Sequence, residues 1–72
     1  NDLSITLINE TAIVRYAGIP GRTYEIQTTS SLASPIIWTP HPAGPQMAKP
    51  DGTFEIIDQA PPSPRFYRAI QL

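Results

Sequence analysis

The 72-residue chain contains no cysteine, a single histidine and no surplus of positive charge. Without cysteine it has neither a disulfide framework nor a thiolate metal site, the usual supports of so small a domain. Five basic residues against six acidic ones give a net charge of -1, whereas nucleic acids and anionic membranes attract clustered positive charge. No apolar run approaches the roughly 20 residues that span a bilayer. We therefore expect no nucleic-acid partner and no membrane insertion.

The length of the chain permits one domain with a small core. A chain this short buries only about 60% of the surface that its unfolded form exposes, so its core must be compact and rich in aromatic residues. The sequence begins with Asn1, Asp2 and Leu3 rather than with methionine, which suggests a processed product or a domain excised from a longer protein. Residues 1–72 are thus interpreted as a single domain, and the absence of cysteine leaves its compartment open.

Two turns that combine proline with glycine divide the chain, one at 19–22 and one at 49–52. In each, proline sets the first corner, and glycine follows where a side chain is least tolerated. The segments that they introduce, 24–28 and 54–58, are rich in β-formers, and 24–28 alternates apolar and polar residues. This pattern predicts antiparallel strands.

A hairpin is predicted at the start of the chain. Residues 3–7 alternate apolar and polar side chains, which is typical of a strand with one buried face. The residues expected to face inward are Leu3, Ile5 and Leu7. Asn9 and Glu10 separate this strand from a second one at 11–17, and asparagine tolerates the positive φ that such a two-residue turn often requires.

Proline dominates the middle of the sequence. Five prolines within 34–50 exclude a helix or a central strand there, because proline lacks the N–H donor and fixes φ. We expect at most a short edge strand over 36–39 and an extended loop over 40–49. Leu32 is expected to fold back over the end of the core, and residues 60–64 to form a rigid surface crossover.

About six short strands, the last over 65–70, and no helix predict an all-β fold. Regular turn signals favour a small antiparallel β-sandwich, in which a crossover such as 59–64 connects the two sheets. An open, partly closed barrel satisfies the same pattern. The sandwich is preferred because the proline-rich loops look like connections between sheets rather than tight meander turns.

Segments 21–32, 52–54 and 65–69, with Trp38 and Asp58 between them, together resemble a short β-module. Such modules occur, often at the C-terminus, in large secreted or surface proteins of environmental bacteria. More distantly, the tyrosine positions are similar to those of fibronectin type III domains. The resemblance implies an immunoglobulin-like sandwich with an accessory role outside the cytoplasm, at the cell surface or in the periplasm. It transfers no functional residue.

A catalytic triad drawn from Ser30 or Ser31, His41 and Asp58 is disfavoured. His41 lies between two prolines in a loop without a neighbouring motif, whereas a triad needs a positioned base. A solvated loop histidine is the preferred interpretation. We expect no catalytic residue, no cofactor and no enzymatic activity.

A calcium site built from Asp51, Glu55 and Asp58 matches no established loop pattern. Asp51 is better explained as the third residue of a Pro-Asp-Gly turn. Asp58 is explained as a strand-terminating residue whose side chain bonds the backbone of the next turn. No metal site is expected.

The aromatic residues are assigned to the core by default. Tyr67 follows a proline-rich corner, which predicts that its hydroxyl bonds the backbone of that corner, as in a tyrosine corner. Trp38 has two interpretations. The preferred one is that it caps the core from an edge strand; the other is that it stands exposed beside His41 as a platform for a sugar ring.

Two functional classes remain. The preferred one is a non-catalytic structural or protein-interaction module of a larger extracellular bacterial protein. It would contact neighbouring domains or subunits of that parent through a sheet edge or an apolar patch. The alternative is a small carbohydrate-binding module that uses Trp38, with His41 and Tyr16 as further candidate contacts for a glycan.

Overall fold

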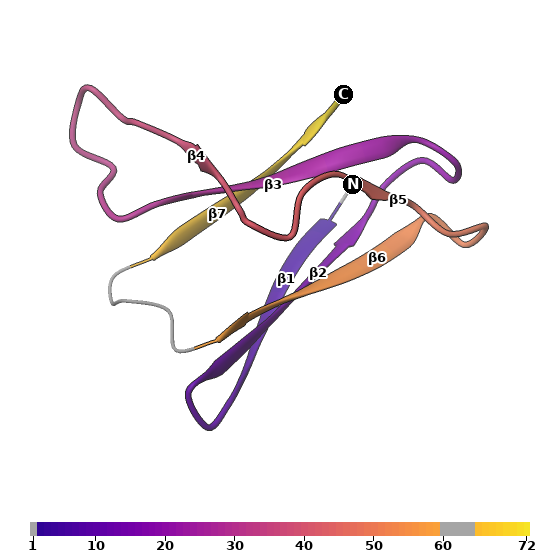
Figure 1. The fold of residues 1–72 in the computed structure, drawn as a ribbon, viewed down its shortest axis with the longest axis horizontal. Helices are drawn as coiled ribbons and strands as arrows, with labels where there is room; N and C mark the ends of the chain where they lie inside the picture. The colour runs from indigo at the N-terminus through magenta and orange to yellow at the C-terminus, as the bar shows by residue number, and fades with distance from the viewer. Residues whose placement is uncertain (1, 60–64) are drawn as a thin grey trace.

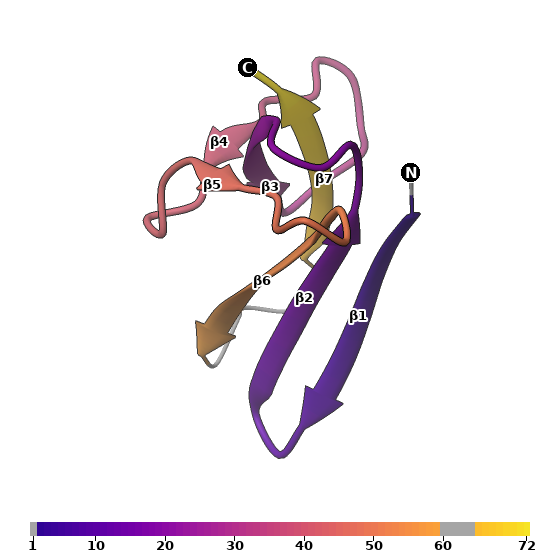
Figure 2. The same cartoon turned by 90° about the vertical axis from the view of Figure 1, so that its right-hand side faces the viewer.

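The computed structural model describes residues 2–59 and 65–72, and this part of the chain forms two antiparallel sheets without a helix (Figure 1). The strands are β1 (Asp2–Ile8), β2 (Thr11–Ala17), β3 (Thr23–Thr29), β4 (Thr39–Pro40), β5 (Gln46–Met47), β6 (Thr53–Gln59) and β7 (Phe66–Gln71). One sheet has the order β1-β2-β6. In the other, β3 pairs with β7 along one side and with the short β4 and β5 along the other. Figure 2 shows the two layers from the side. The predicted all-β sandwich is confirmed.

The predicted turns form as expected. Asn9 has a φ of 56° in the two-residue turn between β1 and β2. In the first Pro-Gly turn the N–H of Arg22 donates to the carbonyl of Ile19 at 3.2 Å, and Gly21 has a φ of 78°. This is a type II turn, in which proline presets the first corner and glycine accepts the positive φ of the second. Gly52 closes the other turn with a φ of 86°.

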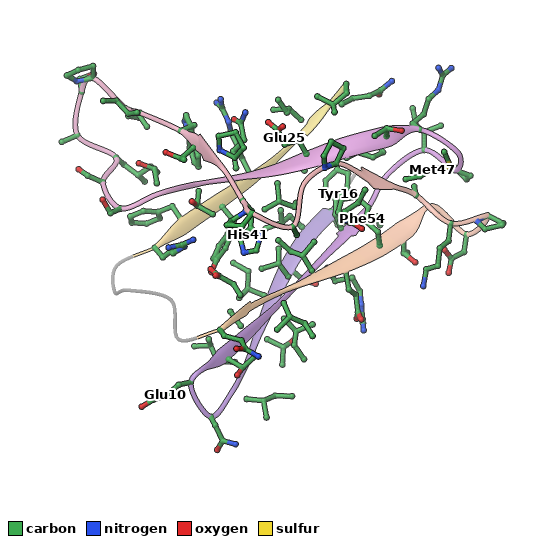
Figure 3. The ribbon with its side chains drawn as sticks, in the orientation of Figure 1. Glu10, Tyr16, Glu25, His41, Met47 and Phe54 are labelled. Carbon is green, nitrogen blue, oxygen red and sulfur yellow. The ribbon has the colours of Figure 1, made fainter. Side chains whose placement is uncertain are left out.

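The core lies between the sheets. Its buried residues are Val14, Tyr16, Tyr24, Ile26, Ala48, Phe54 and Ile56. Three aromatic rings, from β2, β3 and β6, form its centre, and their centroids lie between 5.0 and 5.9 Å apart (Figure 3). Aromatic pairs at such separations contribute beyond their buried area, so this cluster joins the two sheets.

Gly18 carries the chain over this cluster. A Cβ at this position would lie 2.6 Å from the hydroxyl oxygen of Tyr24 and 2.8 Å from Cε2 of Tyr16. The next residue, Ile19, donates its N–H to the same Tyr24 hydroxyl at 2.8 Å. The backbone therefore approaches the rings at a distance that only glycine permits.

The prediction for the first strand is only partly correct. Leu3, Ile5 and Leu7 pair with the inward residues of β2, and so lie on the inner face. Only Leu3 packs against the core, whereas Ile5 is 45% and Leu7 68% exposed. The physical reason is that the second sheet covers β2 and β6 and leaves β1 at the uncovered margin (Figure 2).

The proline-rich segment differs from its prediction. At most a short edge strand was expected over 36–39, and the structure has the two-residue edge strand β4, which begins only at Thr39 and leaves Ile37 exposed. The expected loop over 40–49 contains β5, and the N–H of Ala48 in the same range donates to the carbonyl of Arg22 at 2.9 Å. The strands β4 and β5 are only two residues long because the neighbouring prolines interrupt any longer hydrogen-bonded ladder.

Two further expectations concern the ends of loops. Leu32 is exposed and does not cover the core, because the loop after β3 leads away from the sheets (Figure 1). The predicted crossover over 60–64 lies outside the described residues.

Candidate functional site: a buried polar cluster and an open sheet edge

Asp58 is the centre of a buried polar cluster between the sheets. Alternation along β6 turns Phe54, Ile56 and Asp58 inward, so the strand that supplies core residues also buries a carboxylate, which is 7% exposed. A buried carboxylate is stable only when it is paired and hydrogen-bonded. Its three partners come from two other segments of the chain: His41 follows β4, while Arg65 immediately precedes β7 and Tyr67 lies at the start of that strand.

Tyr67 supplies the strongest of these contacts. Its hydroxyl donates to Oδ2 of Asp58 at 2.5 Å. The pKa of Tyr67 is raised to about 12, mainly by burial and secondly by this hydrogen bond. The single proton of this hydroxyl is directed to the carboxylate of Asp58 rather than to a backbone carbonyl, and the predicted contact with the backbone of the proline-rich corner stays a prediction. The backbone of 60–64 lies outside the described residues.

Arg65 provides the charge that offsets Asp58. Its Nε lies 3.0 Å from Oδ2 of the carboxylate, but this buried N–H makes no hydrogen bond in the described structure. The distance alone defines an ion pair, whereas the direction of the N–H excludes a hydrogen bond. We interpret the contact as charge neutralisation, which leaves Tyr67 as the donor to Oδ2.

His41 completes the cluster and is not the solvated loop residue that was predicted. Its side chain is 9% exposed, and its Nε2 lies 3.2 Å from Oδ1 of Asp58. Its Nδ1 accepts the N–H of Ala43 at 3.0 Å. A neutral imidazole has one donor and one acceptor nitrogen, so these contacts place the proton on Nε2. Both ring nitrogens are thereby engaged.

The structure brings together only two members of the candidate triad. His41 and Asp58 pair, whereas Ser30 and Ser31 line a separate surface depression of about 690 Å³. The Oγ of Ser31 accepts the N–H of Ala33 at 3.1 Å. In this arrangement neither nitrogen of His41 has a free lone pair for a serine proton. From the sequence, His41 and Asp58 were named together only as members of this disfavoured triad, because no local pattern shows that residues 17 positions apart meet.

The depression is lined mainly by serine, threonine and proline side chains. Its lining consists of Thr28, Thr29, Ser30, Ser31, Ala33, Pro35, Ile37, Thr39, Pro40, Pro42 and Arg65. Arg65 is the one charged residue in this lining, and its guanidinium already neutralises Asp58. Among the described residues, the lining of the depression is therefore rich in hydroxyl groups and has no second ionic group.

The three carboxylates of the disfavoured calcium site point in different directions. Oδ1 of Asp51 accepts the backbone N–H of Thr53 at 3.0 Å and its hydroxyl at 2.7 Å, which lowers the pKa of Asp51. Glu55 forms an exposed ion pair with Arg15 on the outer face, while Asp58 points inward. Within 2–59 and 65–72, no three His, Cys, Asp or Glu residues are grouped so that they could hold a metal ion.

The candidate glycan-binding residues do not share a surface. Tyr16 belongs to the core and His41 to the buried cluster. Trp38 is half-buried outside the core, so its expected role as a core cap is wrong. The guanidinium of Arg68 lies 4.5 Å from the centre of the Trp38 ring, and its Nε donates to Gln27 at 2.7 Å. Trp38 is thus held by a cation-π contact at the outer face of the second sheet.

The edge of β1 is the second notable surface. Of the strands that the structure describes, only β2 pairs with β1. The strand is seven residues long, contains no proline or lysine, and carries one charge, at Asp2. Natural sheet edges usually carry charge, proline or a bulge that prevents further pairing. The β1 edge lacks these features over most of its length.

The two-residue turn determines which backbone groups point to this open edge. Ile8 and Thr11 flank the turn and face each other, so they form the hydrogen-bonded pair that closes it. Hydrogen-bonded and non-hydrogen-bonded pairs then alternate along the ladder. The N–H and C=O groups of Leu3, Ile5 and Leu7 are consequently directed away from β2, toward the open edge.

No family model, curated protein or solved structure matches this chain. In the part of the chain that the structure describes, no helix is long and apolar enough to cross a membrane. Function is therefore inferred from the residues and their geometry.

Proposed function

We propose that the chain is a non-catalytic structural and protein-interaction module that binds a neighbouring domain or subunit through the open edge of β1. The observation that carries this proposal is a strand of seven residues with a single partner, on which Ile5 and Leu7 remain exposed. A strand added at this edge gains backbone hydrogen bonds and covers these apolar side chains. The resemblance of 21–32 and 65–69 to secreted bacterial modules supports a larger extracellular bacterial protein as the setting.

The buried polar cluster supports the non-catalytic part of the proposal. Asp58 has a hydrogen bond, a histidine contact and an ion pair, and both ring nitrogens of His41 are engaged. Groups satisfied in this way rigidify a core and fix the relation of its layers. The cluster therefore has a structural role: it fixes one sheet relative to the other, and so fixes the position of the sheet that carries the β1 edge.

Carbohydrate binding is less well supported. Tyr16 and His41 are buried, and Trp38 has Arg68 against its ring. Retardation in polysaccharide affinity gels tests this alternative. Retardation that disappears in Trp38→Ala would favour glycan binding over the function proposed here.

The edge is tested with an extended peptide of alternating valine and threonine flanked by lysines, titrated into isotope-labelled protein. The expected result is a saturable NMR shift of the amides of Leu3, Ile5 and Leu7, which point to the open edge. Ile5→Lys should weaken these shifts, because it places a charge in the edge that the peptide covers.

Ile57→Lys is the matched control, since Ile57 is 58% exposed on the outer face of β6. It should leave the titration unchanged. Shifts that are absent in a monomeric wild type, or that are equally weakened by both variants, contradict docking through β1.

A further inference from the structure

We propose that the β1 edge binds a second copy of the chain, with the two β1 strands antiparallel about a two-fold axis that passes between the two Ile5 residues. The inference rests on the proposed function, because it identifies the occupant of the same edge. The product is a continuous sheet in the order β6-β2-β1-β1-β2-β6. The contact is isologous, so it closes at two subunits.

The side chains of β1 are self-complementary in this register. Leu3 lies opposite Leu7 of the second copy, Ser4 opposite Thr6, and Ile5 opposite its own equivalent. In these inner pairs aliphatic side chains meet aliphatic ones and hydroxyls meet hydroxyls, which are favourable cross-strand pairs, while Asp2 lies opposite Ile8 at each end of the paired strands. All of the inner-face apolar residues of β1 take part.

The backbone favours the same register. The groups directed to the open edge belong to Leu3, Ile5 and Leu7, because the alternate residues bond β2. About the proposed axis, each of these three residues faces another member of the same set. Each facing pair exchanges two hydrogen bonds, so the side-chain and backbone requirements are met together.

Neighbouring registers are less favourable. An axis through Thr6 pairs only 4–8 within the strands and places Asp2 opposite Glu10 of the second copy. An axis through Ser4 pairs only 2–6. The Ile5 axis pairs all seven residues of β1.

The charge distribution agrees with the Ile5 axis. Asp2 is the one charged residue of β1. The two Asp2 carboxylates then lie at opposite ends of the paired strands, about 20 Å apart, which exceeds the Debye length of about 8 Å at physiological salt. Like-charge repulsion does not oppose this pairing.

The sandwich also leaves space for the second copy. The two-fold axis places the second sheets of both copies on the same side of the joined sheet. Because β1 is at the margin that the second sheet leaves uncovered (Figure 2), the layers of the two copies do not compete for the space above the junction. Ile5 and Leu7, which are 45% and 68% exposed in one copy, gain cross-strand neighbours from the other.

Sedimentation over a range of concentrations provides the first test. The wild type should show a monomer-dimer equilibrium. Ile5→Lys should weaken the dimer by more than about tenfold, because it sets two like charges directly opposite each other. Ile57→Lys should behave as wild type. Circular dichroism and urea unfolding establish that each variant is folded.

Cysteine cross-linking tests the register without introducing a charge. Because the chain has no cysteine, a single introduced cysteine can form a disulfide only with a second copy. Facing hydrogen-bonded residues have Cα atoms about 5.5 Å apart, a distance that a disulfide spans. Ile5→Cys should therefore oxidise to a dimer rapidly and Ile57→Cys slowly. Leu3→Cys and Leu7→Cys should cross-link to each other when mixed, and slowly when each is alone.

The outcomes separate this inference from the proposed function. A monomeric wild type whose β1 amides still respond to the alternating peptide overturns the second copy as occupant and retains the edge as a docking site. A monomer without any peptide response contradicts both. A dimer that survives Ile5→Lys and does not cross-link at Ile5→Cys overturns the proposed interface.

Discussion

The hydroxyl of Tyr67 on β7 donates to the carboxylate of Asp58 on β6 at 2.5 Å and so connects the two sheets directly. Phe54, at the other end of β6, contributes to the aromatic cluster. The interior thus has an apolar contact between the sheets at one end of β6 and a polar contact at the other. Variants that remove one of these contacts should each lower the free energy of unfolding, and only loss of the polar contact should change how that free energy depends on pH.

Tyr67→Phe should reduce the free energy of unfolding by about 1–3 kcal/mol, because it removes a donor from a buried carboxylate and leaves the ring in place. Urea denaturation followed by circular dichroism measures this loss. Tyr16→Phe is the matched control, since the described structure gives the Tyr16 hydroxyl no hydrogen bond, and it should change stability by less than about 0.5 kcal/mol. Equal losses in the two variants would contradict the assigned role of the Tyr67–Asp58 bond.

Alkaline pH should weaken the same contact. The pKa of Tyr67 rises from an ordinary 10.0 to about 12 through burial and the Asp58 bond, so the folded state holds this proton more tightly than the unfolded state. The resulting stability is fully present below pH 10 and is lost as pH rises toward 12. Urea midpoints measured across this range should fall more steeply in the wild type than in Tyr67→Phe. Parallel curves would show that Tyr67 is not the group responsible.

Gly18→Ala should destabilise the fold by about 1–3 kcal/mol, because its Cβ overlaps the rings of Tyr16 and Tyr24. Gly44→Ala separates this overlap from backbone strain: Gly44 has a φ of 76°, and no atom lies within 4 Å of the place that its Cβ would occupy. It should lose only about 1 kcal/mol. Thermal unfolding compares the two variants. A Gly18→Ala protein as stable as wild type would contradict the close approach of this backbone to the aromatic cluster.

The hydrogen bonds of His41 predict the neutral tautomer with the proton on Nε2. The ¹⁵N chemical shifts of the imidazole distinguish the two tautomers. His41→Gln places an amide donor near the position of Nε2, whereas His41→Asn places its amide near Nδ1. The glutamine variant should be more stable by about 1 kcal/mol, since it retains a donor to the buried carboxylate. The opposite order, or a proton on Nδ1, would overturn the assignment.

Local sequence patterns predicted the strands and turns that depend on near neighbours. The Asn9 turn and the Pro-Gly turn at 19–22 were correctly expected, because the φ preferences of asparagine, proline and glycine act within a few residues. The short edge strand expected within 36–39 begins only at Thr39, and β5 was missed. Short edge strands are selected by the partner that they pair with, and no local pattern specifies that partner.

The polar cluster was harder to predict for the same reason. Asp58 was explained as a turn residue and His41 as a solvated one, each from its own neighbours in the sequence. Alternation along 54–58 does place Asp58 on the face of Phe54 and Ile56, and this signal of a buried carboxylate was available in the sequence. The sequence held no comparable signal for which residues pair with this carboxylate.

The sequence alone determined an all-β chain, the positions of its main reversals and the inward face of most strands, because turn geometry and side-chain alternation are local properties of the backbone. Tertiary structure decided which inward residues are covered: Val14 is buried, whereas Ile5 on the same face of the neighbouring strand is not. It also decided that His41 and Asp58 meet. Burial and ionic pairing depend on which layer lies opposite, and that is settled by the packing of segments distant in the chain.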